Sequence, residues 1–528
     1  MTIIQRRYAV GAEVISGGAH FRVWAPNANR VQVVLESDRF TRSPNRWSLE
    51  EEAGGYWSAF VPGAEAGDYY RYCLNDDAHL YPDPASRFQP EGPHGPSAIV
   101  DATRFTWTDT QWPGISRENR VIYEMHIGTF TRAGTYCAAI DELAELARLG
   151  VMIIELMPLA EFDGKFGWGY DGVDLFAPYH HYGCPDELRG FINEAHRLGM
   201  GVILDVVYNH CGASGCYFRQ FSLDYFSTNY KSEWGDVFNF DGANSEPVRE
   251  FIKANARYWI EEFHFDGFRL DATQQIFDAS PRHIIKDLVA EARKWAAGRQ
   301  LYIVAENEPQ HSVLVRTSED GGYGLDGIVN DDFHHAAMVA LKGHREAYFH
   351  DYLGRPQEFI SAAKYGFLYQ GQWYAWQKQS RGTPTFSVPQ QAFIHFLQNH
   401  DQVANTGDGT RVNAMAHPGL YRAFTALCLL GPATPMLFQG QEFLSSAPFC
   451  YFADHRAELA EAVAKGRQEF LHQFPSLAVP ESREYLHRPD DPATFIRCKL
   501  NFAERQLHAQ AYQLHKDLLN VRRTDAVF

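Results

Sequence analysis

Residues 267–276 read GFRLDATQQI. The run at 267–270 is short and mostly apolar, as in a strand buried in a sheet or barrel, yet it contains an arginine and is followed by an aspartate. Side chains alternate along a strand, so Arg269 and Asp271 project from the same face. A buried charge without a partner costs several kcal/mol. The stretch therefore predicts either a structural ion pair or part of a functional site at the end of a strand.

Seven similar apolar runs lie on the two sides of this strand, and most of the eight runs are followed by a segment with helical spacing. In chain order the seven are VIYEMHI, VMIIELMP, MGVILDVVYNH, LYIVAENE, GIVN, FIHFLQNHD and TPMLFQGQE. Continuous apolar strands that alternate with helices indicate a parallel sheet buried on both faces. Eight such units over roughly 330 residues favour an α/β fold of the (β/α)8 TIM-barrel type over a doubly wound sheet.

The segments outside the alternating region predict further domains. Residues 1–100 contain alternating runs such as HFRVWAPNANRVQVVLE, separated by Gly and Pro turns, which is typical of a β-sandwich. We expect the barrel at 101–460, with insertions near 206–245 and 343–390. The second insertion is rich in aromatic residues. We expect a helical C-terminal extension at 461–528.

The composition excludes several classes of function. The 528 residues are 45% hydrophobic and 21% charged, as in a globular protein of two or three domains, and the formal net charge is −17. An acidic surface repels phosphate groups, so we expect no nucleic acid and no membrane as partner. The N-terminus lacks a signal-type apolar region and no run is long enough to span a bilayer, which predicts a cytoplasmic protein. The composition carries no signal for an oligomeric state.

Cysteine usage bears on metals and disulfides. Eight cysteines are scattered along the chain, and CGASGC at 211–216 lacks both the CxxC spacing and the paired histidines of a zinc site. We therefore expect reduced thiols, no metal and no cofactor.

Polar residues follow four of the predicted barrel strands. Taken singly, each has an ordinary structural interpretation: a satisfied core histidine, an acid at a helix N-terminus, or an ion pair. Taken together they lie at the C-terminal strand ends, which form the active-site face of a barrel, and we expect one pocket. The set comprises Asp205, Asn209, His210, Arg269, Asp271, Glu306, His400 and Asp401.

The types of residue in this set indicate the chemistry. The sequence has no serine nucleophile elbow, no phosphate-binding Gly loop and no metal-ligand spacing. Paired carboxylates are what cleavage of a glycosidic bond requires, one as nucleophile or base and one as acid. The aromatic insertion suits the apolar faces of sugar rings, although such a segment is more often simply packed.

Four motifs in the order DVVYNH, GFRLDA, VAENE and FLQNHD resemble those of the α-amylase superfamily of glycoside hydrolases. The resemblance covers essentially the whole chain. Connecting segments such as GWGYDGVDLFAPYHHYG and YFADHRAELAEAVAKGRQEF are more similar to the maltooligosyltrehalose trehalohydrolases than to branching or debranching enzymes. This resemblance implies a retaining hydrolase that cleaves the α-1,4 bond next to the terminal trehalose unit of maltooligosyltrehalose. It also implies a carbohydrate-binding-like N-terminal sandwich and a place in trehalose biosynthesis.

The resemblance implies roles for individual residues. Asp271 matches the nucleophile, Glu306 the general acid/base and Asp401 the third acid, which holds sugar hydroxyls. Arg269 would keep Asp271 ionised, because a nearby cation lowers the pKa of a carboxylate. The substrate-binding set implied by the resemblance is Tyr170, whose ring would stack on the sugar, with Asp205, His210, Arg269 and His400.

Two alternative functions stay open at this point, and the sequence departs from the family pattern in one respect. A glycogen-branching or debranching enzyme can pass through the same covalent intermediate, and a non-catalytic glucan-binding protein could share the fold. The usual C-terminal β-domain of the family is expected to be absent or truncated, since the sequence ends at LLNVRRTDAVF.

Overall fold

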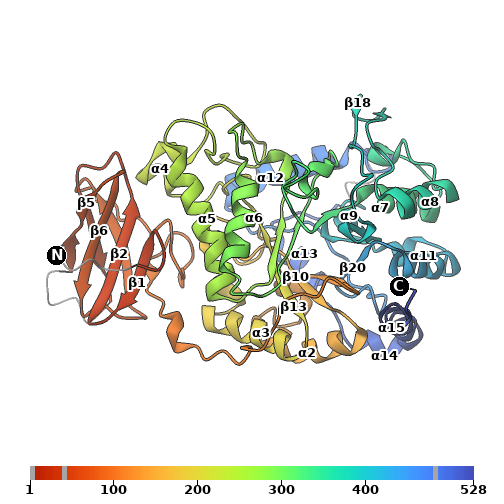
Figure 1. The fold of residues 1–528 in the computed structure, drawn as a ribbon, viewed down its shortest axis with the longest axis horizontal. Helices are drawn as coiled ribbons and strands as arrows, with labels where there is room; N and C mark the ends of the chain where they lie inside the picture. Colours follow the sequence, from red (N-terminus) through yellow and green to blue (C-terminus); the bar gives the residue numbers. More distant parts are fainter. Residues whose placement is uncertain (1–5, 38–44, 480–485, 528) are drawn as a thin grey trace.

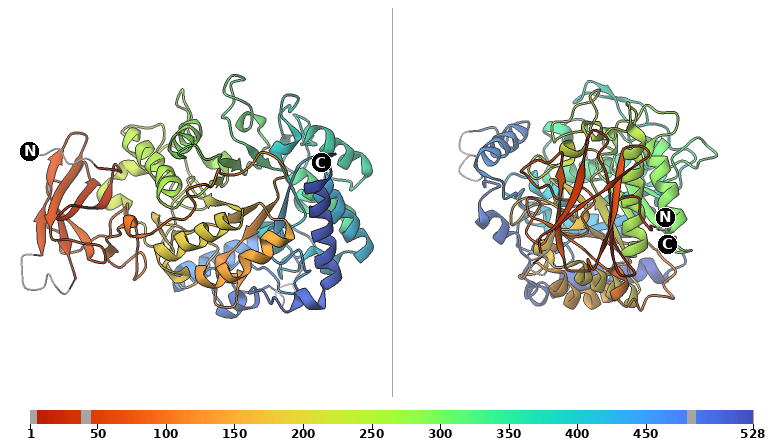
Figure 2. Two further views of the ribbon diagram at one scale, coloured as in Figure 1. Left: turned by 60° about the horizontal axis from the view of Figure 1, so that its bottom comes forward. Right: turned by 90° about the vertical axis from the view of Figure 1, so that its left-hand side faces the viewer.

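The computed structural model describes residues 6–37, 45–479 and 486–527. A β-sandwich lies at one end of the long axis and a larger α/β barrel occupies the rest (Figure 1). Figure 2 shows the same arrangement from two other directions; in its right-hand view the sandwich lies in front of the barrel.

The sandwich consists of two antiparallel sheets, in the strand orders β1-β2-β6-β5 and β4-β3-β7-β8. In β2, GAHFRVW, the side chains of Phe21 and Val23 belong to the core, and the Phe21 ring lies 4.9 Å from that of Tyr70 on the opposite sheet. The predicted sandwich is confirmed. Its strands are β1 (Gly11–Ile15), β2 (Gly18–Trp24), β3 (Val31–Leu35), β4 (Arg46–Ser48), β5 (Glu50–Glu52), β6 (Tyr56–Pro62), β7 (Tyr69–Leu74) and β8 (Ser97–Ala98).

Among the described residues, eight parallel strands close into a barrel in the order β10-β13-β14-β15-β16-β19-β20-β9. All eight apolar runs identified in the sequence form these strands, so the predicted barrel is confirmed. The strands are β9 (Ile122–Met125), β10 (Ile153–Leu156), β13 (Gly201–Val206), β14 (Gly267–Leu270), β15 (Tyr302–Ala305), β16 (Gly327–Val329), β19 (Phe393–Phe396) and β20 (Thr434–Phe438).

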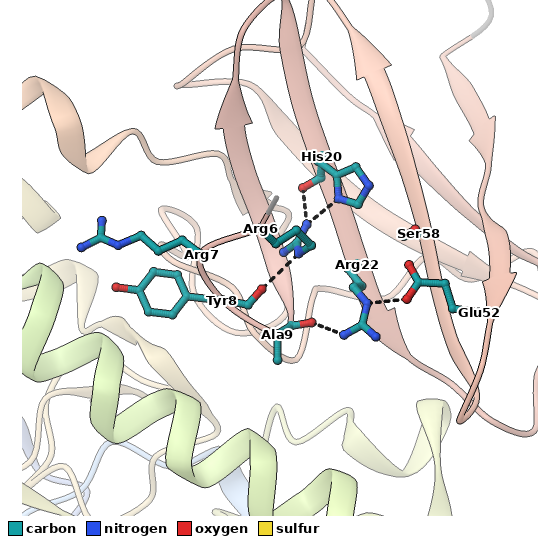
Figure 3. A pocket seen from close by; sticks show the side chains of 8 residues that line it. All are labelled: Arg6, Arg7, Tyr8, Ala9, His20, Arg22, Glu52 and Ser58. Atoms are coloured by element: carbon teal, nitrogen blue, oxygen red, sulfur yellow. Dashed lines mark hydrogen bonds and ion pairs between the residues drawn. The ribbon is translucent and has the colours of Figure 1, made fainter. Parts of the chain in front are cut away.

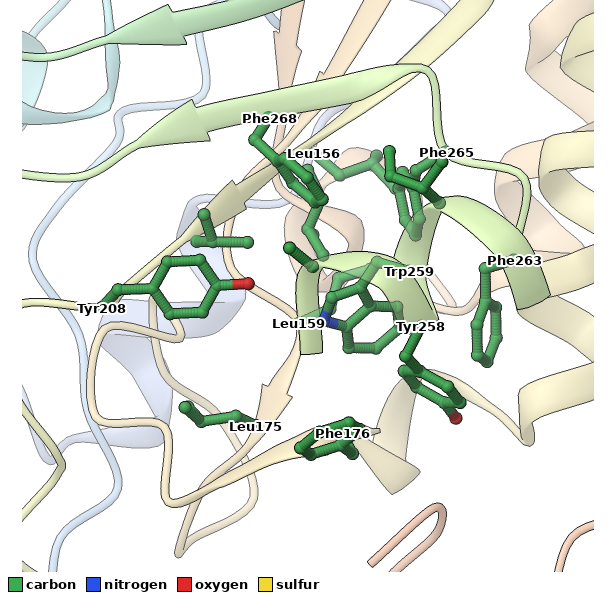
Figure 4. Close-up of a cluster of buried hydrophobic side chains, with 14 of the residues drawn as sticks. Leu156, Leu159, Leu175, Phe176, Tyr208, Tyr258, Trp259, Phe263, Phe265 and Phe268 are labelled. Atoms are coloured by element: carbon green, nitrogen blue, oxygen red, sulfur yellow. The ribbon is translucent and has the colours of Figure 1, made fainter. Parts of the chain in front are cut away.

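The outward-facing residues of the strands pack against a layer of helices. In Figure 4 the ring of Phe268 on β14 points toward Trp259 of α5 (Ser245–Glu262), and both are buried. The other long helices of the described chain are α2 (Tyr136–Leu149), α3 (Pro185–Arg197), α6 (Ile284–Trp295), α7 (Asp331–Lys342), α11 (Pro418–Leu430), α12 (Ala457–Leu471) and α15 (Ala509–Thr524).

The inside of the barrel has an apolar layer and, further along the strands, a charged one. Ile122, Ile153 and Ile203 belong to one buried interior cluster. Because inward-facing residues recur every second position, the next inward residues on these strands are Glu124, Glu155 and Asp205. The strands thus bring carboxylates to the C-terminal part of the barrel interior.

Shorter elements connect these layers. The predicted insertion at 206–245 contains α4 (Phe218–Phe221), and the one at 343–390 contains α8 (Pro356–Tyr365), β17 (Trp373–Tyr374) and β18 (Gln379–Ser380). The remaining short elements are α1 (Ile127–Phe130), β11 (Ala160–Glu161), β12 (Asp174–Pro178), α9 (His400–Ala404), α10 (Val412–Met415), α13 (Pro492–Arg497) and α14 (Glu504–Leu507).

The C-terminal segment contacts the barrel directly. Helix α15 packs against α11 and α2 (Figure 2), and the guanidinium of Arg522 donates hydrogen bonds to the carbonyl oxygens of Leu429, Gly431 and Ala433. The domain limits 1–100, 101–460 and 461–528 remain a proposal.

Aromatic contacts join the sandwich and the barrel. The Tyr8 ring lies 5.7 Å from that of Tyr258 on α5, and the Trp24 ring lies 4.9 Å from that of Tyr225. The Arg87 guanidinium lies 4.3 Å from the centre of the Tyr258 ring. The two lobes therefore share one continuous buried core. Within the described residues, no helix is long and apolar enough to cross a membrane.

Candidate active site

The Arg269 guanidinium lies at the centre of the charged cluster. Its Nη1 atom is 2.6 Å from Asp271 Oδ1 and 3.0 Å from Asp205 Oδ1, and its Nη2 atom is 3.0 Å from Glu306 Oε2. The side chain is only 4% exposed. The sequence predicted that Arg269 and Asp271 share a face, as an ion pair or as part of a functional site; the structure has the ion pair, and the same arginine also contacts two further carboxylates.

Asp271 follows β14 directly, and both of its carboxylate oxygens have donors. Arg269 binds Oδ1, and the Asn209 amide nitrogen donates to Oδ2 at 2.7 Å. Ala272 then adopts a left-handed backbone conformation (φ 37°), a strained geometry that is often found at functional sites. This turn directs the Ala272 N–H toward Glu306 Oε2 at 3.0 Å.

Glu306 directly follows β15, which is the strand next to β14. Its Oε2 atom forms an ion pair with Arg269 and accepts a hydrogen bond from the Ala272 N–H, and in the described part of the chain no hydrogen bond involves Oε1. Burial and the nearby charges of Asp271 and Asp401 raise the pKa of Glu306, although Arg269 opposes them. The side chain is 25% exposed, so a proton on Oε1 can be transferred to a bound molecule.

Asp401 and His400 begin α9, after β19. His400 Nε2 lies 3.3 Å from Asp401 Oδ2. Burial alone would raise the pKa of Asp401, but the charge and hydrogen bond of His400 outweigh it and lower that pKa to about 2. The Asp401 side chain is 41% exposed. It therefore offers an ionised acceptor to a ligand.

The predicted binding residues converge on the same place. The Tyr170 hydroxyl donates to Asp205 Oδ2 at 2.6 Å and contacts His400 Nε2 at 2.9 Å, while its ring stacks on the His400 ring. Burial raises the pKa of Asp205 to about 7 against the opposing effect of Arg269. The ring nitrogens of His210 contact Asn209 Oδ1 and the Tyr170 carbonyl. The structure thus brings all nine residues that the sequence placed in the site, Asn209 and Tyr170 included, into one connected network.

Sequence reasoning missed Glu124 as a member of this network, and it missed the part that Asn209 has in it. Glu124 on β9 contacts His400 through both carboxylate oxygens, at 2.5 Å to Nδ1 and 3.0 Å to the backbone N–H. Asn209 was noticed at a strand end, but not as the partner of Asp271. A detectable signal existed for Glu124, because VIYEMHI, like GFRLD, contains one acid at an inward position of an apolar strand.

The aromatic insertion reaches the edge of this site. Arg381 Nη1 and the Gln377 amide nitrogen each lie 2.8 Å from Glu308 Oε1, and Gly382 N–H donates to the Pro309 carbonyl. The loop after Glu306 is therefore attached to the segment containing β17 and β18. Trp373 in this segment is exposed.

A hollow of about 480 Å³ lies on the sandwich (Figure 3), and none of the residues that line it belongs to the charged cluster. Its cations already have partners: Arg6 binds His20 and Arg22 binds Glu52. Within residues 6–37, 45–479 and 486–527, no group of three or more His, Cys, Asp or Glu side chains is arranged to hold a metal ion.

Comparisons with known proteins agree with this geometry. The family model of the α-amylase catalytic domain matches residues 103–241, and that of carbohydrate-binding module 48, the isoamylase N-terminal domain, matches residues 9–86. A solved structure titled as a putative α-amylase from Salmonella typhimurium superposes with a TM-score of 0.91 at 35% identity, covering 98% of this chain and 87% of that one. Fold and site together define a glycoside hydrolase of the α-amylase class.

Relatives that match nearly the whole chain narrow the assignment from the α-amylase class to one family. Malto-oligosyltrehalose trehalohydrolase of Deinococcus radiodurans is 39% identical, covering 99% of this chain and 84% of the relative. The protein of the same name from Saccharolobus solfataricus is 38% identical, covering 97% of this chain and 86% of the relative. The chain belongs to the malto-oligosyltrehalose trehalohydrolase family.

Proposed function

We propose that the protein hydrolyses the α-1,4 bond next to the terminal trehalose unit of maltooligosyltrehalose and releases trehalose. The observation that carries this proposal is the set of three carboxylates around Arg269, in a chain similar over nearly its full length to trehalohydrolases. A cytoplasmic location and a role in trehalose biosynthesis are part of the same proposal.

In the first step Asp271 attacks the anomeric carbon of the sugar at the cleavage point. Arg269 and Asn209 hold the two carboxylate oxygens at a fixed orientation, which favours a single direction of attack. Glu306 donates the proton on Oε1 to the glycosidic oxygen, and trehalose leaves as a neutral alcohol. The product is a glycosyl ester of Asp271.

In the second step Glu306, now ionised, takes a proton from water, and the resulting nucleophile attacks the anomeric carbon. The bond to Asp271 breaks and its carboxylate is restored. Two inversions retain the α-configuration. Asp401 and the histidines His210 and His400 bind hydroxyls of the sugar, and the Tyr170 ring packs on its face.

Product analysis tests the proposed substrate. The protein is incubated with a maltooligosyltrehalose and, separately, with amylose, and the sugars are separated by chromatography. Trehalose as the main early product from the first substrate supports the proposal. New α-1,6 branches in amylose with no release of trehalose would assign a branching enzyme instead, and no change in either sugar would assign a glucan-binding protein.

The anomeric outcome tests the mechanism separately. Proton NMR of the newly formed reducing end should show the α-anomer first, because the proposed pathway passes through a covalent intermediate. The β-anomer as the first product would exclude Asp271 as a nucleophile and indicate direct attack by water.

A further inference from the structure

The proposed mechanism leaves Glu124 without a role, although it lies directly behind the site. This carboxylate is almost fully buried, at 3% side-chain exposure, and both of its oxygens contact His400. Oε1 lies 2.5 Å from the Nδ1 atom of His400 and Oε2 lies 3.0 Å from its backbone N–H. The contact joins β9 to the start of α9, which are remote in sequence.

The second ring nitrogen of His400 also faces acceptors. Nε2 lies 3.3 Å from Asp401 Oδ2 and 2.9 Å from the Tyr170 oxygen. The Tyr170 hydroxyl proton is already engaged with Asp205, at 2.6 Å, so this oxygen accepts from the imidazole. A neutral imidazole has one donor and one acceptor nitrogen, whereas the charged form has two donors. A ring between two carboxylates therefore matches the charged form.

We propose that Glu124 is a positioning residue of the active site. It holds His400 with a proton on each ring nitrogen, so that His400 presents a charged N–H donor to Asp401. The influence of Glu124 on the substrate passes entirely through His400.

The surroundings of His210 show that contact with two oxygen atoms is not sufficient to keep a buried imidazole charged. Its ring nitrogens face the Asn209 side-chain oxygen and the Tyr170 carbonyl, both of which are neutral. Burial lowers the pKa of His210. For His400, burial acts in the same direction, but the charges of Asp401 and Glu124 outweigh it and raise the pKa well above the ordinary value. The two carboxylates beside His400 therefore account for the opposite directions of the two pKa shifts.

Other ionisable groups around His400 do not replace Glu124. Burial and the charge of Glu124 raise the pKa of Glu155 to about 8, so Glu155 holds its proton at neutral pH. Burial lowers the pKa of His126 to about 3, so that ring stays neutral. Among the described residues, the carboxylates that act on the charge of His400 are Glu124 on β9 and Asp401 on α9, and the Tyr170 oxygen contacts its Nε2 atom. The charge of His400 in turn acts on His126 after β9, Glu155 on β10 and Asp205 on β13.

The test is the pH dependence of the Glu124→Gln variant. The new amide can accept from the His400 backbone N–H and donate to Nδ1, which keeps the ring in place but makes it neutral. The acidic limb of kcat/KM reports the carboxyls that must be ionised, Asp271 and Asp401. Without that cation the pKa of Asp401 should rise, and the acidic limb should move up by about 1–3 pH units. At the optimum, kcat/KM should fall about 10- to 100-fold, the range found for carboxylates that orient histidines in metal sites.

Glu155→Gln is the matched control. Glu155 is a buried acid next to Glu124 in the strand register, and replacing a protonated carboxyl by an amide conserves its charge. Its acidic limb should stay at the wild-type position. Glu124→Asp keeps the charge, so its acidic limb of kcat/KM should lie closer to the wild-type position than that of Glu124→Gln, even if kcat is low. An unshifted limb in folded Glu124→Gln, or an equal shift in Glu155→Gln, would overturn the proposal.

Neutron diffraction of the wild-type protein gives a second test that needs no variant. Deuterium on both ring nitrogens of His400 at neutral pD supports the proposal, and deuterium on only one overturns it. The inference rests on the proposed site, but the pH profiles can be measured with any α-1,4-glucan that the wild type cleaves. A failure to release trehalose would therefore be distinguished from a failure of this inference.

Discussion

Two aspartates flank strand β14, and they have opposite surroundings. Asp266 precedes the strand and is fully buried. Its Oδ2 atom lies 2.8 Å from His196 Nε2 and 3.0 Å from the Val202 N–H. Its Oδ1 atom lies 2.8 Å from Trp112 Nε1 and 3.2 Å from the guanidinium of Arg299.

Asp271, at the other end of the strand, belongs to a cluster that is only partly satisfied by the protein. Its own oxygens have donors, but no hydrogen bond in the described chain involves Glu306 Oε1, and the Asp401 side chain is 41% exposed. Both clusters contain buried charges. Only the one at the C-terminal strand ends leaves acids available to a ligand.

This difference shows that the end of the strand at which a buried charge lies indicates its role in a barrel. Charges at the N-terminal ends of the strands contribute to stability, and charges at the C-terminal ends to chemistry. If this holds, substitutions at the two ends of one strand should separate activity from stability.

The largest effect is expected for Asp271→Asn. The change conserves shape but removes the charged nucleophile, so kcat should fall by about 10⁴-fold or more. The melting temperature should stay close to that of the wild type. Steady-state kinetics on maltooligosyltrehalose and circular dichroism measure the two quantities. Retention of more than about a tenth of the activity would show that another group is the nucleophile.

In the first step of the reaction, Glu306→Gln should slow only substrates whose leaving group needs a proton. It should lose about 10²- to 10⁴-fold in kcat on maltooligosyltrehalose, yet still form the glycosyl–enzyme from an α-glycosyl fluoride, whose leaving group needs little protonation. In the wild type, the alkaline limb of kcat/KM should lie above the range of an ordinary glutamate, because the pKa of Glu306 is raised and the acid must be protonated. Equal losses in the rate of glycosyl–enzyme formation from both substrates would mean that Glu306 positions the sugar.

The sequence predicted the barrel and the residues after its strands because both depend on local patterns. Apolar runs with polar ends mark strands, and parallel strands place those ends on one face. Arg269, Asp271, Glu306 and Asp401 were found in this way.

Contacts between distant segments could not be predicted in the same way. Glu124 meets His400 only because β9 and β19 both neighbour β20 in the closed barrel, and Asp266 reaches His196 through the packing of α3. The central position of Arg269 among three acids likewise depends on the register between strands.

Asp266→Asn should reverse the pattern of Asp271→Asn. The substitution removes one of the two carboxylates that contact buried His196, leaving Asp109, and it removes the carboxylate that pairs with the partly buried guanidinium of Arg299. Breaking such a pair costs about 3–5 kcal/mol of folding free energy, while kcat of the folded fraction should stay within about twofold, since the active site lies at the other end of the strand. Thermal unfolding and kinetics below the melting temperature measure both effects. A large loss of kcat with unchanged stability would contradict the division between the two ends.

The smallest effect concerns the pH dependence of stability at the N-terminal end of the barrel. Burial lowers the pKa of His196, but Asp266 and Asp109 outweigh it and the net pKa is raised. A histidine whose pKa is higher in the folded state stabilises the protein fully below its unfolded pKa of roughly 6.5. This contribution is lost as the pH rises through the folded value. The stability of the wild type relative to His196→Gln should therefore be greatest at about pH 5–6 and shrink toward alkaline pH. Melting temperatures of both proteins at one heating rate and ionic strength, measured across this range, give the difference directly. A constant difference from pH 5 to 9 would show that His196 contributes packing and neutral hydrogen bonds rather than charge, and a difference that grows with pH would reverse the assigned sign.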